Sequence, residues 1–371
     1  MKLALAGGGT GGHIYPALAL AERFAGEGAF APLDVLYLGM PDGLEAELVR
    51  AAGLRFAPVR AAPLLRGRPR ALGTTLARNA LGFGDALAAF HRFAPDALIA
   101  TGGYAAVPAV AALRAVRTLG RSRARIALLE PNLEAGLANR LLAPLADEVW
   151  LGAALPGRKL GARERLVGIP VRASFARPRA AAQARAELGL EPGRTTVVAF
   201  GGSQGARTLN ETFAALAERG ALGERQVLLV AGRANGEALA ARLRSIPQIR
   251  VVGYLDDPAP GYAAADLVVA RAGASTLAEL AASGTPALLV PYPFATGAHQ
   301  LHNARAVAAR GAALVLLDAE LTPERLAAEL DRALEPERLA AMRAAVCGER
   351  DPAAAIVARV KAWLGTNGSV P

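Results

Sequence analysis

The sequence predicts an α/β protein made of two doubly wound domains, each built on a parallel sheet. Three observations support this prediction. The chain has 371 residues, more than the roughly 100–200 residues of one typical domain. Short apolar runs alternate with longer alanine- and leucine-rich segments that carry charges at helical spacing. A strand followed by a glycine loop and a helix occurs twice, with the loops near Gly8 and Gly201.

The alternation in the first half of the chain predicts a parallel sheet covered by helices on both faces. Buried strands are predicted for the apolar runs at Lys2–Ala6, Val35–Leu38, Ala97–Ala100 and Ile126–Leu129. Helices are predicted between them at Ala17–Phe24, Leu44–Ala51 and Ala105–Val116.

The same alternation restarts after Pro170 and a stretch rich in arginine, alanine and proline. Strands are predicted at Thr196–Phe200, Val227–Val230, Leu267–Ala270 and Ala287–Val290. We therefore place one domain over residues 1–170 and a second over residues 171–351. A last helix is predicted over Pro352–Trp363, and we expect the segment 352–371 to pack back on the first domain.

The composition excludes several classes of protein. Hydrophobic residues make up 53% of the chain and charged residues 20%, which is typical of a packed globular protein and not of a disordered one. Cys347 is the single cysteine, so neither an intramolecular disulfide nor a cysteine-based zinc site is predicted. A reducing compartment suits such a chain.

The net charge of +10 indicates affinity for anionic partners. All but three of the 42 basic residues are arginines. Anionic lipid, phosphorylated substrates and nucleic acid all fit a basic surface. Aromatic residues make up only 5% of the chain and no arginine-rich run is interleaved with them, so we expect no nucleic-acid partner.

Neither a signal peptide nor a membrane-spanning segment is predicted. The apolar stretch before the first glycines is too short for a signal peptide. Two longer uncharged windows, Ala97–Leu113 and Leu280–Ala298, are interrupted by glycines or prolines.

The segment Gly7–Gly12 matches the pattern G-x-G-x-x-G, in which glycines let backbone N–H groups approach a diphosphate. A dinucleotide site also requires an acidic residue after the next strand, where this chain has Leu38-Gly39-Met40, so a nicotinamide enzyme is not favoured. His13 follows the loop, at the turn into a helix that we expect Pro16 to open. His13 is either a general base at the site or a residue that caps or packs on the helix.

Two turns in the second half have the same character. In Gly201–Arg207 the Ser203 hydroxyl would bond a phosphate oxygen, although a tight strand-to-helix turn also explains the glycines. In the RAGASTLAE stretch, Ser275 or Thr276 would bind phosphate or simply cap the helix. Glu279 would hold a ribose diol or face solvent.

A metal site is not predicted. His299 and His302 are three residues apart on a predicted helix, but the sequence offers no third ligand near them. Asp256 and Asp257 are adjacent and are expected to form a turn before Pro258.

Taken together, these residues resemble the MurG family, the UDP-N-acetylglucosamine transferases that complete the lipid-linked peptidoglycan precursor. The resemblance covers nearly the whole chain, in family order. Its segments are GGGTGGHIYPALALA at 7–21, TGGYAAVPAV at 101–110, EPNLEAGLANRLLA at 130–143, GIPVR at 168–172, GGSQGARTLN at 201–210, YLDD at 254–257, RAGASTLAELAASGTPALLVPYP at 271–293 and HQLHNA at 299–304.

The resemblance implies a GT-B fold, in which two Rossmann-like domains hold the active site in an interdomain cleft. It also implies an inverting transfer that needs neither a metal nor a cofactor. The first domain would face the acceptor and the membrane, and the second would bind UDP-N-acetylglucosamine. The substrate-binding residues that it implies are Thr10, Gly11, Gly12, Asn132, Arg172, Ser203, Tyr254, Leu255, Ala274, Ser275, Thr276, Leu277, Ala278, Glu279 and Gln300.

Individual roles follow from the same resemblance. Leu255 would meet the uracil through its backbone, with Tyr254 beside the ring, and Glu279 would hold the ribose hydroxyls. Gln300 would bond hydroxyls of N-acetylglucosamine, and Arg172 would neutralise charge on the diphosphate. The other contacts fall to Ser203, the Ala274–Thr276 turn, Asn132 and the Thr10-Gly11-Gly12 loop.

The acceptor hydroxyl must lose a proton as it attacks, and His13 is our candidate for the base. Glu130 is its rival, or the group that orients the acceptor. The chain departs from the family at Leu129-Glu130-Pro131-Asn132, where His-Glu-Gln-Asn is common. Ile169 replaces an asparagine, and Gly297-Ala298 stand where an acidic, polar pair is common. These departures concern the polar contacts to sugar and acceptor more than the reaction class.

The resemblance implies a polyprenyl-diphosphate-linked muramyl pentapeptide as acceptor, at the cytoplasmic face of the cell membrane. One segment gives a physical reason to expect peripheral binding, since leucines would enter the interface while arginines meet anionic headgroups. A solvated loop and helix is the alternative. The residues concerned are Leu64, Leu65, Arg66, Arg68, Arg70 and Leu72, continuing to Leu76 and Arg78.

Other functions fit the same residues. A UDP-sugar epimerase or another UDP-sugar-dependent lipid glycosyltransferase would keep the fold. A non-catalytic subunit would bind the sugar nucleotide without turnover. Release of UDP together with a glycosylated lipid distinguishes a transferase from both the epimerase and the binding subunit.

Overall fold

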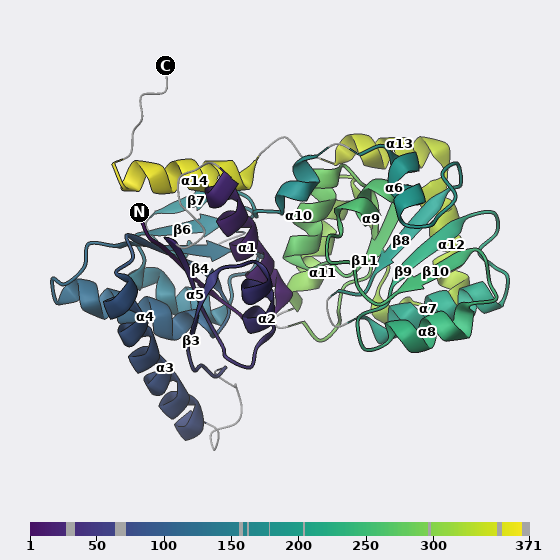
Figure 1. Cartoon of the computed structure of the whole chain (residues 1–371). Helices are drawn as coiled ribbons and strands as arrows, with labels where there is room; N and C mark the ends of the chain where they lie inside the picture. Colours follow the sequence, from purple (N-terminus) through teal and green to yellow (C-terminus); the bar gives the residue numbers. More distant parts are fainter. Residues whose placement is uncertain are drawn as a thin grey trace. The chain divides into compact units, whose positions relative to one another are not determined.

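The chain forms two compact units in a computed structural model (Figure 1). The first unit comprises Met1–Ala173 and Arg350–Pro371, and the second comprises Ser174–Glu349. The chain therefore leaves the first unit once and returns to it at the C-terminus. The structure describes residues 1–26, 34–63, 72–155, 159–161, 163–177, 179–202, 205–295, 298–346 and 351–365.

The sheet of the first unit contains strands β1 (Leu3–Gly7), β2 (Val35–Gly39), β3 (Arg55–Pro58), β4 (Ala97–Gly102), β5 (Arg125–Glu130), β6 (Glu148–Leu151) and β7 (Glu164–Leu166). They are parallel, in the order β3-β2-β1-β4-β5-β6-β7. The order changes direction between β1 and β4. In open parallel sheets ligands bind at the carboxyl ends of the strands at such a point.

Helices cover both faces of this sheet, as predicted. They are α1 (Gly11–Gly26), α2 (Leu44–Ala51), α3 (Leu72–Phe93), α4 (Ala106–Thr118), α5 (Leu137–Leu142) and α14 (Pro352–Trp363), with a 3-10 turn, η3 (Ala143–Leu145). Alternate residues of β1 serve the two faces: Ala4 and Ala6 pack with α3 and α4, whereas Leu3 and Leu5 pack with α1 and α14. The period of two in a strand gives each face its own apolar core.

The helix α14 closes one face of the first sheet. Ile356, Val357 and Val360 are fully buried in the same core as Leu3 and Leu5. At the end of the helix the ring of Trp363 packs on Trp150, with the centroids 5.3 Å apart. This C-terminal helix is therefore part of the first unit.

The second unit repeats the design. Its strands are β8 (Thr196–Phe200), β9 (Gln226–Val230), β10 (Ile249–Val252), β11 (Leu267–Ala270), β12 (Ala287–Leu289) and β13 (Ala313–Val315). They are parallel in the order β10-β9-β8-β11-β12-β13, so the direction changes between β8 and β11. The prediction of two parallel-sheet α/β domains is confirmed.

The helices of the second unit are α6 (Ala181–Glu187), α7 (Arg207–Glu218), α8 (Gly236–Leu243), α9 (Ala259–Ala264), α10 (Ala274–Ser283), α11 (His299–Ala308), α12 (Pro323–Leu334) and α13 (Pro336–Ala345). Two 3-10 turns accompany them, η4 (Ala173–Ala176) and η6 (Asp318–Glu320). The turn η4 begins at the last residue of the first unit. Leu209, Phe213 and Leu326 bring α7 and α12 to one face of the sheet. Tyr262 and Leu280 bring α9 and α10 to the other.

One predicted helix start was wrong. The first helix begins at Gly11, five residues before Pro16. Proline is tolerated early in a helix because the first N–H groups have no intrahelical partner, but here Pro16 lies beyond the first turn. The consequence is that Gly12 and His13 belong to the helix and not to the loop.

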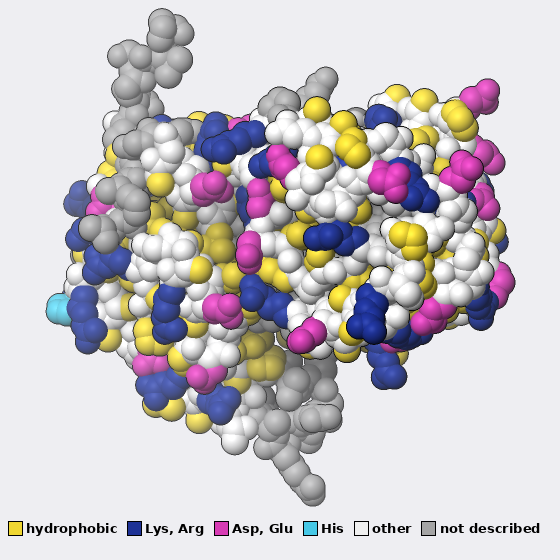
Figure 2. Space-filling model, turned by 45° about the vertical axis from the view of Figure 1, so that its right-hand side comes forward, with side chains coloured by type: hydrophobic (Ala, Val, Ile, Leu, Met, Phe, Trp, Pro, Cys, Tyr) yellow, Lys and Arg dark blue, Asp and Glu magenta, His cyan; other side chains and the backbone are white. Residues whose placement is uncertain are grey.

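Basic and acidic side chains share the surface. On the face drawn in Figure 2, Lys and Arg are spread among Asp and Glu. None of the helices within the described part of the chain has both the length and the apolar character needed to cross a bilayer.

Candidate functional site

The first glycine loop joins β1 to α1 and lies against the end of β4. A Cβ atom at Gly103 would be 2.2 Å from the carbonyl oxygen of Gly8, and the φ of Gly103 is +77°, so only glycine fits there. Gly9 has a φ of +87°, and a side chain on it would meet Tyr104. Gly9 and Thr10 are exposed, so the loop presents its backbone to solvent at the point where the strand order changes.

His13 is held by the end of β4. Its Nδ1 lies 2.7 Å from the carbonyl oxygen of Thr101, and the Thr101 hydroxyl donates to the carbonyl oxygen of His13 at 2.6 Å. Because a carbonyl can only accept, Nδ1 carries the proton and Nε2 carries the lone pair of the neutral imidazole. This is the tautomer that a base acting through Nε2 requires.

Glu130, at the end of β5, is buried, with 1% of its surface exposed. Its Oε1 accepts from the backbone N–H of Asn132 at 3.0 Å and from the amide Nδ2 of Asn132 at 3.3 Å. Its Oε2 accepts from the N–H of Gly136 and from Nδ2 of Asn139, both at 2.9 Å. Four donors fill the roughly four acceptor positions of a carboxylate, so Glu130 fixes the loop that carries Asn132.

His13 and Glu130 are neighbours. The Cβ position of Gly102 would be 3.0 Å from His13 Nδ1 and 3.4 Å from Asn139 Nδ2, and Asn139 donates to Glu130. Arg172 lies close to the same helix, with its guanidinium 4.5 Å from the ring centroid of Tyr15. The first unit thus gathers the glycine loop, the histidine and the Glu130 cluster at the carboxyl ends of its strands.

Buried acidic groups lie beneath the loop. Glu45 is completely buried, and its Oε1 accepts from the N–H of Met40 at 3.1 Å. The Tyr37 hydroxyl donates to the carbonyl oxygen of Gly7. Burial, and then the charge of Glu45, raises the pKa of both Tyr37 and Tyr104. Both phenols therefore remain hydrogen-bond donors at neutral pH.

In the second unit the helix α10 begins shortly after the end of β11. Its N-cap is Gly273, which makes no side-chain cap, and Leu277 is the first residue whose N–H bonds back to Gly273. Ser275 and Thr276 lie inside the first turn, so the interpretation of either as the N-cap was wrong. The N–H groups of the first turn and the helix dipole make this end suitable for a phosphate.

Gln300 on α11 is tied to the same turn. Its Oε1 accepts from the N–H of Ala272 at 3.2 Å and from the N–H of Tyr292 at 3.0 Å. Asn303, one turn further along the helix, donates to the carbonyl oxygen of Ala272 at 3.3 Å. With Oε1 engaged by two backbone donors, Nε2 is the atom of this amide that can donate to a ligand.

Glu279 lies on α10 and accepts from the hydroxyl of Tyr262, with Oε2 and Oη 2.9 Å apart. Tyr262 comes from α9, which follows the Tyr254–Leu255 segment. The ring of Tyr254 is covered by the guanidinium of Arg233 at 4.4 Å from its centroid. The second unit thereby brings together the residues 254–255, 274–279 and 300.

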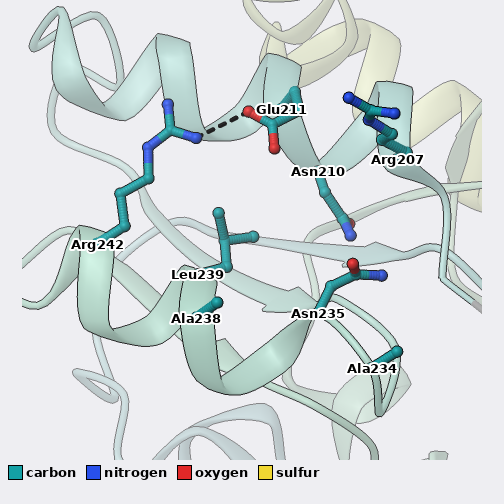
Figure 3. Close-up of a pocket in the computed structure, with 8 residues that line it drawn as sticks. All are labelled: Arg207, Asn210, Glu211, Ala234, Asn235, Ala238, Leu239 and Arg242. Atoms are coloured by element: carbon teal, nitrogen blue, oxygen red, sulfur yellow. Dashed lines mark hydrogen bonds and ion pairs between the residues drawn. The ribbon is translucent and has the colours of Figure 1, made fainter.

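The second glycine loop leads to a small pocket between α7 and α8, about 180 Å³ in volume (Figure 3). The Arg242–Glu211 ion pair lies at one end, and Asn210 and Asn235 approach each other at the other (Figure 3). Gly202 and Gly205 have φ of +83° and +79°, so the turn needs glycines. Ser203 lies outside the described residues.

His299 and His302 both lie on α11, at its first and fourth residues. Within the ranges that the structure describes, no three His, Cys, Asp or Glu side chains gather as metal ligands would. The Asp256–Asp257 pair lies in a turn, where Asp257 accepts from the Ser174 hydroxyl at 2.8 Å and from the N–H of Ala259 at 3.1 Å.

Three residues that hold His13, Glu130 and Glu279 in place had no role predicted from the sequence: Thr101, Asn139 and Tyr262. Thr101 and Asn139 lie in segments that carried the family resemblance, and the polar type of each was the available signal. Tyr262 lies outside those segments, and its partner Glu279 is 17 residues away on another helix. Only the fold brings those two side chains together.

The fold and these arrangements define a glycosyltransferase built from two parallel-sheet domains. The model of the glycosyltransferase family 28 N-terminal domain matches residues 3–151, and that of the family 28 C-terminal domain matches residues 196–359. The chain has the GT-B fold.

Curated relatives identify which group within glycosyltransferase family 28 the chain belongs to. A protein of Desulforudis audaxviator is 41% identical over 342 residues, and one of Halothermothrix orenii is 39% identical over 344, each match covering 88% of both chains. Both carry the name UDP-N-acetylglucosamine--N-acetylmuramyl-(pentapeptide) pyrophosphoryl-undecaprenol N-acetylglucosamine transferase. The crystal structure of Acinetobacter baumannii MurG is 26% identical, with a TM-score of 0.72 over 97% of this chain and 99% of that one. The chain belongs to the MurG family of glycosyltransferase family 28.

Proposed function

We propose that the chain transfers N-acetylglucosamine from UDP-N-acetylglucosamine to the 4-hydroxyl of the muramyl sugar of undecaprenyl-diphosphate-linked muramyl pentapeptide, the lipid I to lipid II step of peptidoglycan synthesis. Membership of the family and the names of the relatives support the substrates. The observation that carries the proposal is the cluster in the second unit, where a tyrosine-held carboxylate and an amide flank the N-terminus of α10. A ribose, a sugar and a diphosphate require those three kinds of partner.

The donor is bound by the second unit in this proposal. The backbone of Leu255 reads the uracil beside Tyr254, and Glu279 accepts from the ribose hydroxyls. The first turn of α10, at Ala274–Thr276, together with Leu277, Ala278 and Ser203, binds the diphosphate region. Nε2 of Gln300 donates to the hexosamine.

The reaction is an inverting displacement in this proposal. The acceptor hydroxyl attacks the anomeric carbon from the face opposite the diphosphate, the bond from that carbon to the UDP oxygen breaks, and its electron pair leaves with UDP. Nε2 of His13 takes the proton of the attacking hydroxyl. N–H dipoles of α10 and the guanidinium of Arg172 stabilise the negative charge that grows on the diphosphate.

Glu130 is a positioning residue in this proposal and not the base. Its carboxylate accepts four hydrogen bonds, which leaves no acceptor position for the proton of a substrate. It holds the loop of Asn132, which completes the site together with Thr10, Gly11 and Gly12.

The decisive experiment supplies the purified chain with radiolabelled UDP-N-acetylglucosamine and a lipid-linked muramyl acceptor. We expect label in the extracted lipid phase, together with one free UDP for each sugar transferred. A reaction without acceptor is the control and should leave the label in the aqueous phase. Epimerised nucleotide sugar, or donor binding with no turnover, would replace this proposal by an epimerase or by a non-catalytic subunit.

We also propose that the enzyme binds peripherally to the cytoplasmic face of the membrane, through the start of α3 and the segment before it. Leu76 and Leu81 on α3 are 57% and 51% exposed, and Arg78 lies exposed between them. Such an arrangement lets leucines enter an interface while an arginine meets a headgroup. The residues 64–71 and the side chain of Leu72, which the sequence also assigned to this surface, lie outside the described residues.

Reversing the charge of Arg66, Arg68, Arg70 and Arg78 to glutamate should abolish cosedimentation with vesicles of anionic lipid. The physical reason is the loss of about 1 kcal/mol of attraction per arginine near the surface. The matched control reverses four exposed arginines of the second unit, Arg244, Arg250, Arg310 and Arg332. Equal loss in both variants would point to net charge alone and remove this segment from the membrane site.

A further inference from the structure

Tyr262 on α9 is almost completely buried, with 2% of its surface exposed. Its hydroxyl donates to Oε2 of Glu279 at 2.9 Å. The ring stacks on Phe200, with centroids 4.7 Å apart and planes inclined by 17°, and Phe175 meets it edge-on at 5.3 Å. Rings on two sides fix the tyrosine, and its hydroxyl therefore fixes one oxygen of the Glu279 carboxyl.

The bond matters because a glutamate side chain is flexible. Ordering it costs up to about 2 kcal/mol of rotamer entropy, and Glu279 is only half-buried. A hydrogen bond to a carboxylate is among the stronger ones in proteins, so Tyr262 orders the group before a ligand arrives. A carboxylate has about four acceptor positions, enough to accept from a phenol and from the two hydroxyls of a vicinal diol.

We infer that Tyr262 is a positioning residue that makes the donor site select ribose over deoxyribose, by holding the Glu279 carboxylate in the orientation that accepts both ribose hydroxyls. This inference rests on the role proposed above for Glu279. A polar site that loses one hydroxyl of its ligand keeps a desolvated acceptor without a partner, which is the strongest way to reject an analogue.

Tyr262 also lies between the segment assigned to the uracil, at Leu255, and the glycine loop assigned to the phosphates. Phe200, on which it stacks, ends β8 directly before the second glycine loop. A Cβ atom at Gly261 would lie 3.0 Å from Phe200 and 3.2 Å from Cδ1 of Leu255, so this glycine lets those two side chains approach. Loss of the Tyr262 hydroxyl should therefore weaken donor binding and leave the chemical step largely intact.

The test is Tyr262→Phe, which removes one oxygen and keeps the stacked ring. KM and kcat are measured with UDP-N-acetylglucosamine and with its 2′-deoxy and 3′-deoxy uridine analogues. We expect KM for the ribose donor to rise about tenfold, kcat to stay within about twofold, and the preference for ribose over deoxyribose to fall by about the same tenfold. Glu279→Ala should remove the preference altogether.

Tyr37→Phe is the matched control. Tyr37 is fully buried in the first unit, and its hydroxyl donates to the Gly7 carbonyl oxygen at 3.1 Å. This variant also loses a buried hydrogen bond but should keep the ribose preference. A cooperative thermal unfolding transition in each variant confirms that the protein is folded when its ribose preference is measured.

Calorimetric titration with UDP and with its deoxy analogues separates the possible outcomes, because it needs no acceptor. A preference that Glu279→Ala loses and Tyr262→Phe keeps overturns the inference and leaves the proposed function standing. A wild-type chain that binds UDP and deoxy-UDP equally overturns both the inference and the ribose role of Glu279. Loss of the binding preference in both variants, without sugar transfer by the wild type, supports the inference and refutes the transfer.

Discussion

At the scale of single residues, the orientation of His13 is set by its hydrogen bonds with Thr101. The carbonyl oxygen of Thr101 accepts from Nδ1 of His13, and the Thr101 hydroxyl binds back to the His13 backbone. This pair connects α1 to β4 across the point where the strand order changes. It sets both the tautomer and the direction of the ring.

His13→Ala should lower kcat by roughly 10²–10⁴-fold, because that is the usual contribution of a general base, and leave the affinity for UDP-N-acetylglucosamine nearly unchanged. Transfer rates and a donor titration measure the two effects. His91→Ala is the control, since His91 is an exposed histidine on α3. A His13→Ala variant with a near-normal turnover rate would dismiss this residue as the base.

The sequence named His13 because it adjoins a glycine loop, and it named Glu130 without deciding between base and orienting group. The four donors around Glu130 could not be predicted, since two of them, Gly136 and Asn139, reach it through a loop that folds back over the strand end. Tyr262 was missed because burial of a tyrosine ring is common and its hydroxyl partner depends on how two helices pack.

At the scale of elements, central strands were predictable and several outer strands were not. The fully buried β1, β2 and β4, and β8 with only Phe200 half-buried, carry mainly apolar runs, as strands covered on both faces do. The edge strands β3 and β7 contain exposed or half-buried arginines and a glutamate, so they have no such run. Their backbone pairing with β2 and β6, and not their own hydrophobicity, makes them strands.

Two glycines of α3 offer a matched test of packing. A Cβ atom at Gly82 would lie 1.7 Å from the backbone carbonyl oxygen of Arg60, whereas one at Gly84 would meet nothing within 4 Å. Gly82→Ala should lower the free energy of unfolding by roughly 1–3 kcal/mol, because backbone must move. Gly84→Ala should raise it by roughly 0.5–1 kcal/mol through helix propensity.

Urea unfolding of both variants, followed by circular dichroism, measures the difference. Arg60 is itself fastened to α3, since its backbone N–H and its guanidinium bind Asp85 at 2.7–3.1 Å. The carbonyl of Arg60 therefore has little room to withdraw. Equal unfolding midpoints for the two variants would contradict the close approach at Gly82.

At the scale of the whole molecule, a buried carboxylate joins the two chain segments of the first unit, through β6 and α14. Glu148 on β6 accepts from Arg359 on α14, from the indole N–H of Trp150 at 2.9 Å, and pairs with Arg165 at 3.1 Å. Burial by itself would raise the pKa of Glu148, but hydrogen bonds from Arg359, Trp150 and Arg165 outweigh it and lower the pKa to about 2.

This pKa predicts an acid-sensitive attachment of α14. The folded value of about 2 lies below the ordinary glutamate value of 4.5, so the stabilisation is complete above pH 4.5 and is lost as the pH falls toward 2. Glu148→Gln should lower the stability by roughly 2 kcal/mol at pH 7 and by much less at pH 3. Urea midpoints at both pH values check this, and a difference independent of pH would contradict it.

The return of α14 also has a consequence for biosynthesis. Leu3 and Leu5 share their core with Ile356 and Val360, which are synthesised about 350 residues later. One apolar face of the first sheet is therefore only partly covered, by α1, until residues 352–363 have been translated. A nascent chain stalled before codon 352 should accordingly be a client for chaperones that bind apolar surface.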